Sequence, residues 1–476
     1  MRSRLATPDI TNETTLTDGL ARLGEEMTPL PKDRRRSLVD LCGFPVVIAL
    51  AARLVVVAVV LTRDPGLRPD LLFATADTQR YLDLAASLLR GEFSTAEGPE
   101  INRLPGYPLL LLPGVALGWP TTFALLVQSL LCCLLVIAVV RSSRLIGLGE
   151  RAAMAAGILC ALEPTLLLWS VQLMAEVELG VIVSFSLGAL FAYLRDGSRT
   201  GLAMATVLAA GSALVKPVAF ALSFVVAFIA SFAAQKKGTP RGFLRLFLTA
   251  ALPGALVLGA WSMRNWSVAG FTGFSTQFSQ VNRSAELVAR QWEYRRAAAQ
   301  RVELERPPRG LNQPLTADRP PRIDASLRAR LRLHFVGVFR TLTNPGVLTW
   351  LQFLGLEPRG MSATLEMFRD GPWRFLLRSV TDRPYVVVGS ALLTGLNLVY
   401  WVLFVRGYKV VIHRAPTAAW ASALVILYFA LASGGPWGQS RFRIPFVSIV
   451  CVLAGAAFDR EGRRDGEPVF SQGRET

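Results

Sequence analysis

Apolar blocks long enough to cross a membrane constrain this chain more than any other feature. They recur through its 476 residues, most of them about 18–23 residues long and poor in charge. A helix of about 20 apolar residues spans the ~30 Å hydrocarbon core of a bilayer. Only 18% of the chain is charged, whereas a soluble domain has roughly a quarter. The sequence therefore predicts an all-α polytopic membrane protein.

Ten of these blocks are predicted to span the membrane, and an eleventh, at 106–118, is shorter. The shorter block is expected to form a juxtamembrane helix or a half-insertion, so the bundle should contain ten or eleven transmembrane helices. No cleavable signal pattern precedes the first block, which begins near Leu41. The predicted spans are 41–62, 121–140, 151–169, 172–194, 201–216, 217–233, 244–262, 385–405, 416–433 and 445–458.

Basic residues in the short loops predict the orientation, because cytoplasmic loops carry an excess of Lys and Arg. If the N-terminus lies inside, every predicted inside segment is basic. Counting 106–118 as a full span would place the loop around Arg141 outside, which argues against it. Both termini are therefore predicted inside. The inside basic residues are Lys32, Arg34, Arg35, Arg36, Arg141, Arg144, Arg151, Arg195, Arg199, Lys236, Lys237, Arg241, Arg245, Arg406, Lys409, Arg414, Arg460, Arg463 and Arg464.

This topology divides the chain into five segments. The stretch 263–384 is external and holds 19 Arg and no Lys against 10 acidic residues, a net charge of +9. These Arg could form a solvated surface, contact anionic lipid headgroups, or bind a phosphate-bearing substrate. The segments are a cytoplasmic tail at 1–40, a core at 41–285 with an external loop at 63–120, an external segment at 286–384, further spans at 385–458, and a cytoplasmic tail at 459–476.

Cysteine and histidine usage argues against several kinds of chemistry. All five Cys lie in or beside apolar spans, and none has metal-ligand spacing with His334 or His413. Only His334 is predicted outside, so a Ser-His or Cys-His nucleophile is not expected. No Walker-type phosphate loop occurs. No cofactor, bound metal or nucleic-acid partner is therefore predicted.

An acidic residue stands at the head of a predicted helix in the first external loop. Asp77 precedes apolar residues at helical spacing, which predicts an amphipathic helix over 78–90 that ends at Gly91. Its place is that of a helix cap, a role worth about 1 kcal/mol that explains an Asp by itself. A rigid, ionised carboxylate also suits a general base. Both roles remain open.

Other polar residues lie near the predicted outer face, and each has a structural explanation. Arg103 precedes a Pro-Gly-Tyr-Pro turn and could pair with Asp77 or contact lipid phosphate. Glu176 lies in an apolar span, where an acid is costly and marks a functional site by default. Lys216, between two spans, could snorkel to the interface or neutralise a lipid phosphate.

Two further motifs lie where spans meet the outer face. Arg264 and Asn265 stand between two Trp residues that could form only an aromatic belt. Arg441 and Arg443 precede the last span and could simply anchor it. All four are candidates for phosphate or sugar contact.

Taken together and in order, these motifs resemble those of the GT-C group of multi-span, lipid-phosphate-sugar-dependent glycosyltransferases. The most similar branch is that of protein mannosyltransferases and aminoarabinose transferases, the glycosyltransferase family 39-like enzymes. The resemblance covers roughly 41–285 and 385–450 and leaves 286–384 unmatched. It is carried by Asp77-Thr-Gln-Arg-Tyr81, Arg103-Leu-Pro-Gly-Tyr107-Pro108, Glu163-Pro164 with Glu176, Lys216-Pro217, Trp261-Ser-Met-Arg264-Asn265, and Arg441-Phe-Arg443-Ile-Pro445.

The resemblance implies an inverting transfer of sugar from a polyprenyl-phosphate donor to an acceptor hydroxyl of a lipid, glycan or protein. It implies a bacterial inner-membrane enzyme with its site facing the periplasm, and Asp77 and Glu176 as its catalytic residues. Thr78 stands where many members have a second acid, so a two-carboxylate or metal-assisted mechanism is not implied. The implied substrate-binding residues are Tyr81, Arg103, Tyr107, Lys216, Arg264, Asn265, Arg441 and Arg443.

A transporter or flippase for lipid-linked sugars is the alternative. Such a protein would carry its polar residues at mid-bilayer, on broken helices. Here the candidate residues gather at the predicted outer rim, and the first external loop is large, which favours an enzyme.

Overall fold

The computed structural model describes residues 32–63, 66, 76–235, 239–299, 326–356, 380–435 and 438–459. Residues 1–44 and 45–476 form two separate compact units. Of the first unit, only the beginning of helix α2 (Lys32–Arg63) is described, and everything below concerns the second. Most of both predicted cytoplasmic tails, and much of the segment 286–384, lie outside the described residues.

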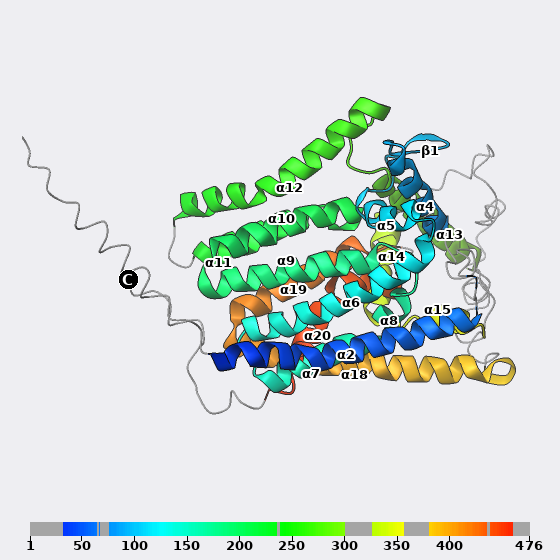
Figure 1. Ribbon diagram of the computed structural model, residues 1–476. Helices are drawn as coiled ribbons and strands as arrows, with labels where there is room; N and C mark the ends of the chain where they lie inside the picture. The colour runs from blue at the N-terminus through cyan, green and yellow to red at the C-terminus, as the bar shows by residue number, and fades with distance from the viewer. Residues whose placement is uncertain are drawn as a thin grey trace, which may run out of the picture. The chain divides into compact units, whose positions relative to one another are not determined.

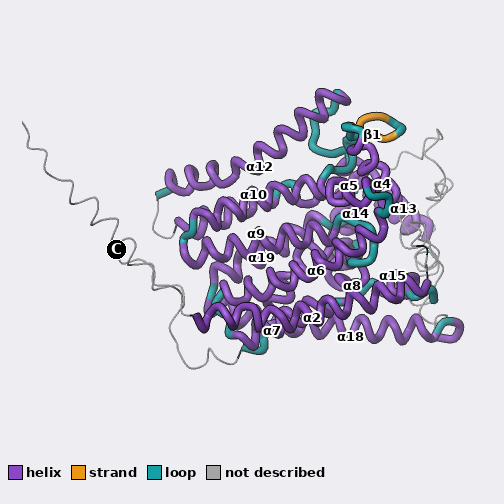
Figure 2. Tube along the Cα trace, viewed as in Figure 1, coloured by secondary structure: helices purple, strands orange, loops and turns teal. Residues whose placement is uncertain are grey.

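Helices make up nearly all of the described chain (Figures 1 and 2). The strands β1 (Ser94–Thr95) and β2 (Gly98–Pro99) form one short antiparallel pair in the first external loop. The long helices after α2 are α6 (Pro120–Leu145), α9 (Glu176–Asp196), α10 (Arg199–Val215), α12 (Pro240–Ala269), α13 (Gln277–Ala299), α14 (Leu327–Thr343), α18 (Pro384–Arg414) and α19 (Pro416–Ala432). The shorter ones are α4 (Ala76–Leu89), α5 (Gly106–Ala116), α7 (Glu150–Leu162), α8 (Pro164–Trp169), η1 (Pro217–Ala219), α11 (Leu222–Ala234), α15 (Val347–Phe353), η3 (Ser440–Arg443) and α20 (Ile444–Ala456).

The core of the bundle lies around two helices. Helix α9 packs against α6, α10 and α20, and α20 packs in turn against α7 and α18. Every residue of α20 is buried. Helices α12 and α18 are apolar, yet only 17% and 11% of their most apolar windows are covered by the rest of the protein. Apolar helices left uncovered in this way are suited to face lipid.

Six described helices are long and apolar enough to cross a membrane, namely the segments 43–63, 120–145, 176–196, 217–234, 240–269 and 384–414. The prediction of an all-α polytopic membrane protein is confirmed. Each of the ten predicted spans coincides with a helix or a pair of helices, although several are shorter than a bilayer crossing. The number of crossings and their orientation stay predictions.

Two helices differ from a simple span for a local reason. The predicted span 151–169 is broken into α7 and α8, because Pro164 lacks the N–H that would continue the helix. The block at 106–118 forms α5, which at 11 residues reaches only ~16 Å. It is the short helix that its length predicted.

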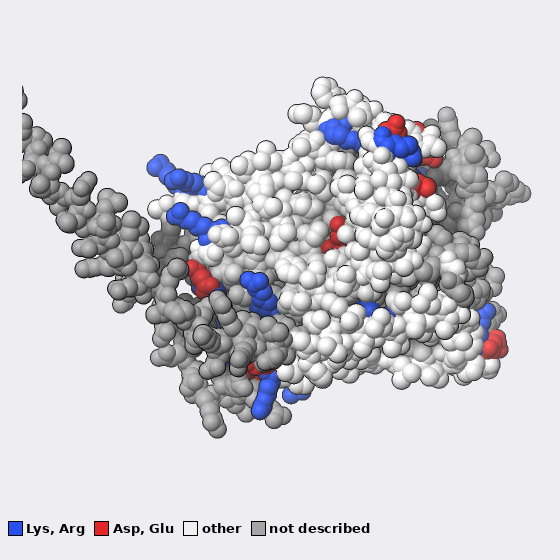
Figure 3. Space-filling view, in the orientation of Figure 1, with Lys and Arg blue, Asp and Glu red and all other residues white. Residues whose placement is uncertain are grey.

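Charge is distributed unevenly over the face of the molecule in Figure 3. The middle of that face is almost entirely uncharged, and Lys and Arg side chains lie mainly towards the two ends of the helices. This pattern fits a membrane-embedded bundle, because charged side chains are costly at bilayer depth. The loop with β1, predicted to be external and called the external loop below, lies at one of these ends, between the end of α4 and the beginning of α5 (Figure 1).

Candidate functional site

Asp77 lies in the first turn of α4 and forms an ion pair with Arg103. The helix begins at Ala76, so Asp77 is inside the helix and not at the cap position that spacing predicted. A carboxylate in the first turn still interacts favourably with the helix dipole. The side chains of Asp77 and Arg103 are 27% and 16% exposed, respectively. Solvent or a ligand can therefore reach this pair.

A buried acid that sequence reasoning missed holds Arg103 in place. Glu100 is 1% exposed, and its Oε1 accepts the backbone N–H groups of Asn102 and Arg103 at 2.6 and 2.9 Å. Its Oε2 accepts from Arg80 Nε at 2.7 Å. Glu100 therefore fixes the turn from which Arg103 reaches Asp77. Only its position just before the Pro-Gly-Tyr-Pro turn hints at this role in the sequence.

Arg264 binds the external loop, and its neighbour Asn265 binds the segment that follows α12. Arg264 donates to the carbonyls of Glu100 at 2.5 Å and Phe93 at 2.9 Å, and lies over the rings of Phe93 and Trp261. Asn265 is fully buried and donates to the carbonyls of residues 273 and 274, each at 3.0 Å. Both predicted substrate contacts thus donate hydrogen bonds to the protein itself.

A second charged cluster forms around Glu176 at the start of α9. Glu176 Oε1 lies 2.5 Å from Lys216 Nζ and 3.6 Å from Arg441 Nε. Glu176 is buried, whereas the side chains of Lys216 and Arg441 are 12% and 15% exposed. Within the described structure, Arg441 Nε and Nη1 and Glu176 Oε2 make no hydrogen bond. The cluster has two cations for one carboxylate, so it carries a net positive charge.

The helix break at Lys216 and the lack of a side chain at Gly106 allow this cluster to lie close to the external loop. Lys216 stands at the break between α10 and η1. Gly106, at the start of α5, lies so close to Val215 that an added Cβ would come within 2.7 Å of Val215 Cγ2. A glycine is needed there because no side chain fits between the two segments. The turn that follows Arg103 is thereby packed beside Lys216.

Tyr81 is a buried residue of α4 that lies within electrostatic range of both clusters. It is 3% exposed, and burial raises the pKa of its phenol, which Arg103, Glu176, Asp77 and Arg441 also influence electrostatically. The Asp77 carboxylate likewise acts on the Lys216 ammonium. Charges from α4, α9, η3 and the external loop therefore share one site. The phenol stays protonated at neutral pH because its pKa lies above an already high ordinary value.

Tyr107 is a buried neighbour of Tyr81. Its ring packs edge-on against Tyr81, with the centroids 4.9 Å apart. It is fully buried, and its hydroxyl donates to Gln128 Oε1 at 2.7 Å. The Gln128 amide donates in turn to the carbonyls of Ser170 and Gln172, at 3.0 and 2.9 Å. Tyr107 therefore packs inside the protein, against Tyr81.

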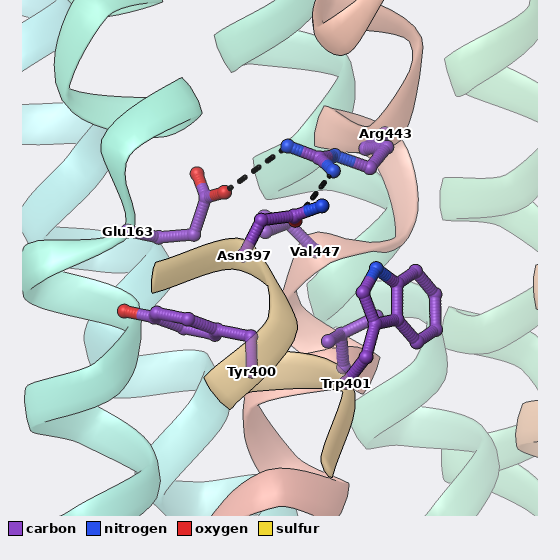
Figure 4. A pocket seen from close by; sticks show the side chains of 7 residues that line it. Glu163, Asn397, Tyr400, Trp401, Arg443 and Val447 are labelled. Atoms are coloured by element: carbon purple, nitrogen blue, oxygen red, sulfur yellow. Dashed lines mark hydrogen bonds and ion pairs between the residues drawn. The ribbon is translucent and has the colours of Figure 1, made fainter. Parts of the chain in front are cut away.

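Arg443 is bound by partners other than the Glu176 cluster, and Figure 4 shows it beside Glu163 and Asn397. Its guanidinium donates to Thr165 Oγ1, Asn397 Oδ1 and the Leu342 carbonyl, and lies 3.8 Å from Glu163 Oε1. It is 5% exposed. The sequence offered Arg441 and Arg443 as equal candidates for a leaving phosphate, and only Arg441 lies beside Glu176 and Lys216.

In the described part of the chain, no three His, Cys, Asp or Glu side chains lie close enough together to hold a metal ion. The buried atoms at the site that lack a hydrogen bond within the described structure are Arg103 Nε, Arg441 Nε and Nη1, and Glu176 Oε2, so most of them are cationic donors. Guanidinium and ammonium groups bind phosphate oxygens. The arrangement therefore offers an anion site next to an accessible carboxylate.

No protein-family model and no curated protein matches the sequence. Among solved structures, the archaeal oligosaccharyltransferase AglB from Archaeoglobus fulgidus, in complex with an inhibitory peptide and a dolichol-phosphate, is 12% identical with a TM-score of 0.50. That match covers 89% of this chain and 50% of AglB. ArnT from Cupriavidus metallidurans, bound to undecaprenyl phosphate, is 14% identical with a TM-score of 0.48, over 89% of this chain and 60% of ArnT.

This chain therefore spans about half the length of AglB, and the similarity lies in the arrangement of helices and not in shared residues. AglB is a GT-C glycosyltransferase. Its likeness to the described bundle agrees with the resemblance that the sequence motifs show. The protein thus has the helical membrane fold of the GT-C glycosyltransferases.

Proposed function

We propose that this protein is a glycosyltransferase that moves a sugar from a polyprenyl-phosphate donor to an acceptor hydroxyl. One observation carries the proposal: an accessible carboxylate, Asp77, lies within electrostatic range of a cluster in which two cations, Lys216 and Arg441, share the single carboxylate of Glu176. The AglB structure of the same fold contains a dolichol-phosphate, a lipid phosphate of the class proposed here.

In the proposed reaction, Asp77 accepts the proton of the acceptor hydroxyl as its oxygen attacks the anomeric carbon. The bond between that carbon and the phosphate oxygen breaks, and the lipid phosphate leaves with the bonding electron pair. Attack opposite the leaving group inverts the anomeric centre. Lys216 and Arg441 stabilise the charge that develops on the phosphate, because they are already in place before the reaction.

Glu176 has a positioning role in this proposal. Its buried carboxylate holds Lys216 and lies within 4 Å of Arg441, so it keeps two like charges side by side at a site that would otherwise repel them. The proposed setting is the periplasmic face of a bacterial inner membrane, and the acceptor is a lipid, glycan or protein.

The decisive experiment uses purified protein in lipid nanodiscs with a labelled polyprenyl-phosphate sugar. Asp77→Asn should lower the transfer rate by about 10²–10⁴-fold, the range of a lost general base, and leave donor binding intact. Asp83→Asn is the matched control, because Asp83 lies exposed on the same helix. Transfer by Asp77→Asn at the rate of the control would remove Asp77 from the chemistry.

A transporter or flippase for lipid-linked sugars has one feature in its favour. The helix break at Pro164 lies beside the buried Glu163–Arg443 pair, and broken helices with buried charges are typical of transporters. Proteoliposomes separate the two functions. A transporter would move a labelled lipid-linked sugar between leaflets without cleaving it, whereas the proposed enzyme releases lipid phosphate.

A further inference from the structure

The short helix η3 carries two arginines that leave it in different directions. A 3-10 helix has three residues per turn, so side chains two positions apart cannot share a face. Arg441 lies over the ring of Trp169, with its guanidinium carbon 5.5 Å from the ring centroid, and 3.6 Å from Glu176. Arg443 extends towards α8, α14 and α18 instead.

The hydrogen bonds of Arg443 are made entirely within the protein. Nη1 donates to the Leu342 carbonyl at 3.0 Å and to Asn397 Oδ1 at 2.7 Å, and Nη2 donates to Thr165 Oγ1 at 2.8 Å. With Glu163 at 3.8 Å as its counter-ion, this buried guanidinium has its charge matched and donates three hydrogen bonds to the protein. Arg441, in contrast, has a buried Nε and Nη1 without a hydrogen bond in the described structure.

The partners of Arg443 are themselves fixed. Glu163 Oε2 accepts the Leu166 N–H at 2.6 Å and so caps α8. Asn397 donates to the Thr343 carbonyl at 3.0 Å. The carbonyls of residues 342 and 343 end α14, where intrahelical partners are missing and a cation is favoured. Arg443 is thus tied to the first turn of α8, the last turn of α14 and the middle of α18.

Helix α8 links the two arginines a second time. Its first turn holds Arg443 through Thr165, and its last residue, Trp169, lies under Arg441. A shift of Arg443 would therefore move η3 relative to Trp169, the residue over whose ring Arg441 lies. Of the two arginines of η3, Arg443 is buried, whereas the side chain of Arg441 is 15% exposed.

We infer that Glu163, Thr165 and Asn397 are positioning residues, which hold Arg443 and through it fix η3, so that the Arg441 guanidinium lies at the lipid-phosphate site. This inference rests on the proposed function, since it assigns Arg441 to the donor phosphate. In this inference the buried Glu163–Arg443 pair has a role besides stability, because it positions Arg441 through η3.

A double-mutant cycle between Thr165→Val and Arg441→Ala tests the inference. The full chain is placed in nanodiscs, and the Kd for undecaprenyl phosphate is measured together with the thermal unfolding midpoint. Each single variant should weaken binding, Thr165→Val about fivefold and Arg441→Ala about tenfold. The double variant should bind no more than about twofold worse than Arg441→Ala alone, because Thr165 acts only through Arg441.

The control is Thr206→Val, which removes a buried threonine hydroxyl bonded within α10 and remote from η3. If Thr165→Val folds poorly, Asn397→Ala replaces it in the double-mutant cycle with Arg441→Ala. Multiplied effects in the double variant, or equal losses in Thr165→Val and Thr206→Val, would overturn the inference. No binding of undecaprenyl phosphate by the unaltered protein would overturn the proposed function as well, and so tells the two failures apart.

Discussion

At the residue scale, the candidate site is a balance of buried charges. Glu176 is buried to 1% exposure against Lys216, and Arg441 adds a second cation. Burying a charge without a partner is costly, and breaking such a pair costs more than the pair contributes. The cluster is therefore sensitive to any change in its charge count, and a phosphate would complete it.

Lys216→Met should destabilise the protein by about 3–5 kcal/mol, because it leaves the Glu176 carboxylate buried with a weaker partner. The double variant Glu176→Gln with Lys216→Met should recover most of that stability, since it buries no charge of this pair. It should not recover donor binding, which needs the cation. Denaturant unfolding in detergent and donor titration measure the two quantities. Equal stability of the single and double variants would contradict the buried ion pair.

At the element scale, the external loop is held by contacts from distant parts of the chain. Arg264 binds the carbonyls at both ends of the β1–β2 segment, and Ser275 donates to the Asn102 carbonyl at 2.7 Å. The loop that carries Arg103 is therefore fixed to the exit of α12. This explains why two residues that resemble substrate contacts lie inside the protein.

Arg264→Ala should loosen this loop. Two hydrogen bonds to carbonyls and the contact with two aromatic rings are lost, so backbone amides over residues 93–103 should exchange with solvent faster. Hydrogen exchange followed by mass spectrometry measures this directly. Arg245→Ala is a control on the same helix, at its far end. Unchanged exchange over 93–103 would show that other contacts hold the loop.

Gly106→Ala should disturb the packing of α5 on the end of α10. Its Cβ would meet Val215 Cγ2 at 2.7 Å and the Leu214 carbonyl at 2.9 Å, and overpacking of this kind costs about 1–3 kcal/mol. Gly211→Ala is the control, since nothing lies within 4 Å of its added Cβ. That substitution in α10 should be neutral or slightly stabilising. Thermal unfolding of both variants compares them.

At the scale of the whole molecule, the arrangement is that of a helical bundle with its candidate site at one end. Lys216, which precedes η1, and Arg441 of η3 both lie beside Glu176 of α9, and the start of α5 packs on Val215 next to Lys216. In the proposed reaction, a site at the end of the bundle would let an acceptor approach from water while the lipid tail of the donor remains in the bilayer. The orientation of this end decides which compartment supplies the acceptor.

Cysteine labelling tests the predicted orientation. Ala96→Cys in the external loop should react with a membrane-impermeant maleimide in intact cells. Thr200→Cys, at the turn between α9 and α10, should react only after permeabilisation, because that turn is predicted to face the cytoplasm. Both positions are exposed, and the native Cys132, Cys133, Cys160 and Cys451 are buried. The reverse pattern would invert the topology.

The sequence by itself determined the helices, their apolar faces and the identity of Asp77, Glu176, Lys216 and Arg441 as unusual polar residues. These are local properties, since periodicity and a charge within an apolar block can be read without knowing what packs against them. The tertiary structure decided which of those residues meet. Asp77 pairs with Arg103 across 26 positions and Glu176 with Lys216 across 40.

The same reason explains what the sequence did not settle. Arg441 and Arg443 are alike in type and two positions apart, yet they face opposite sides of η3 and bind different partners. Glu100 has no unusual sequence context, and its role arises from the turn that folds around its carboxylate. Ion pairs and hydrogen bonds between distant segments depend on packing in three dimensions, which no local pattern encodes.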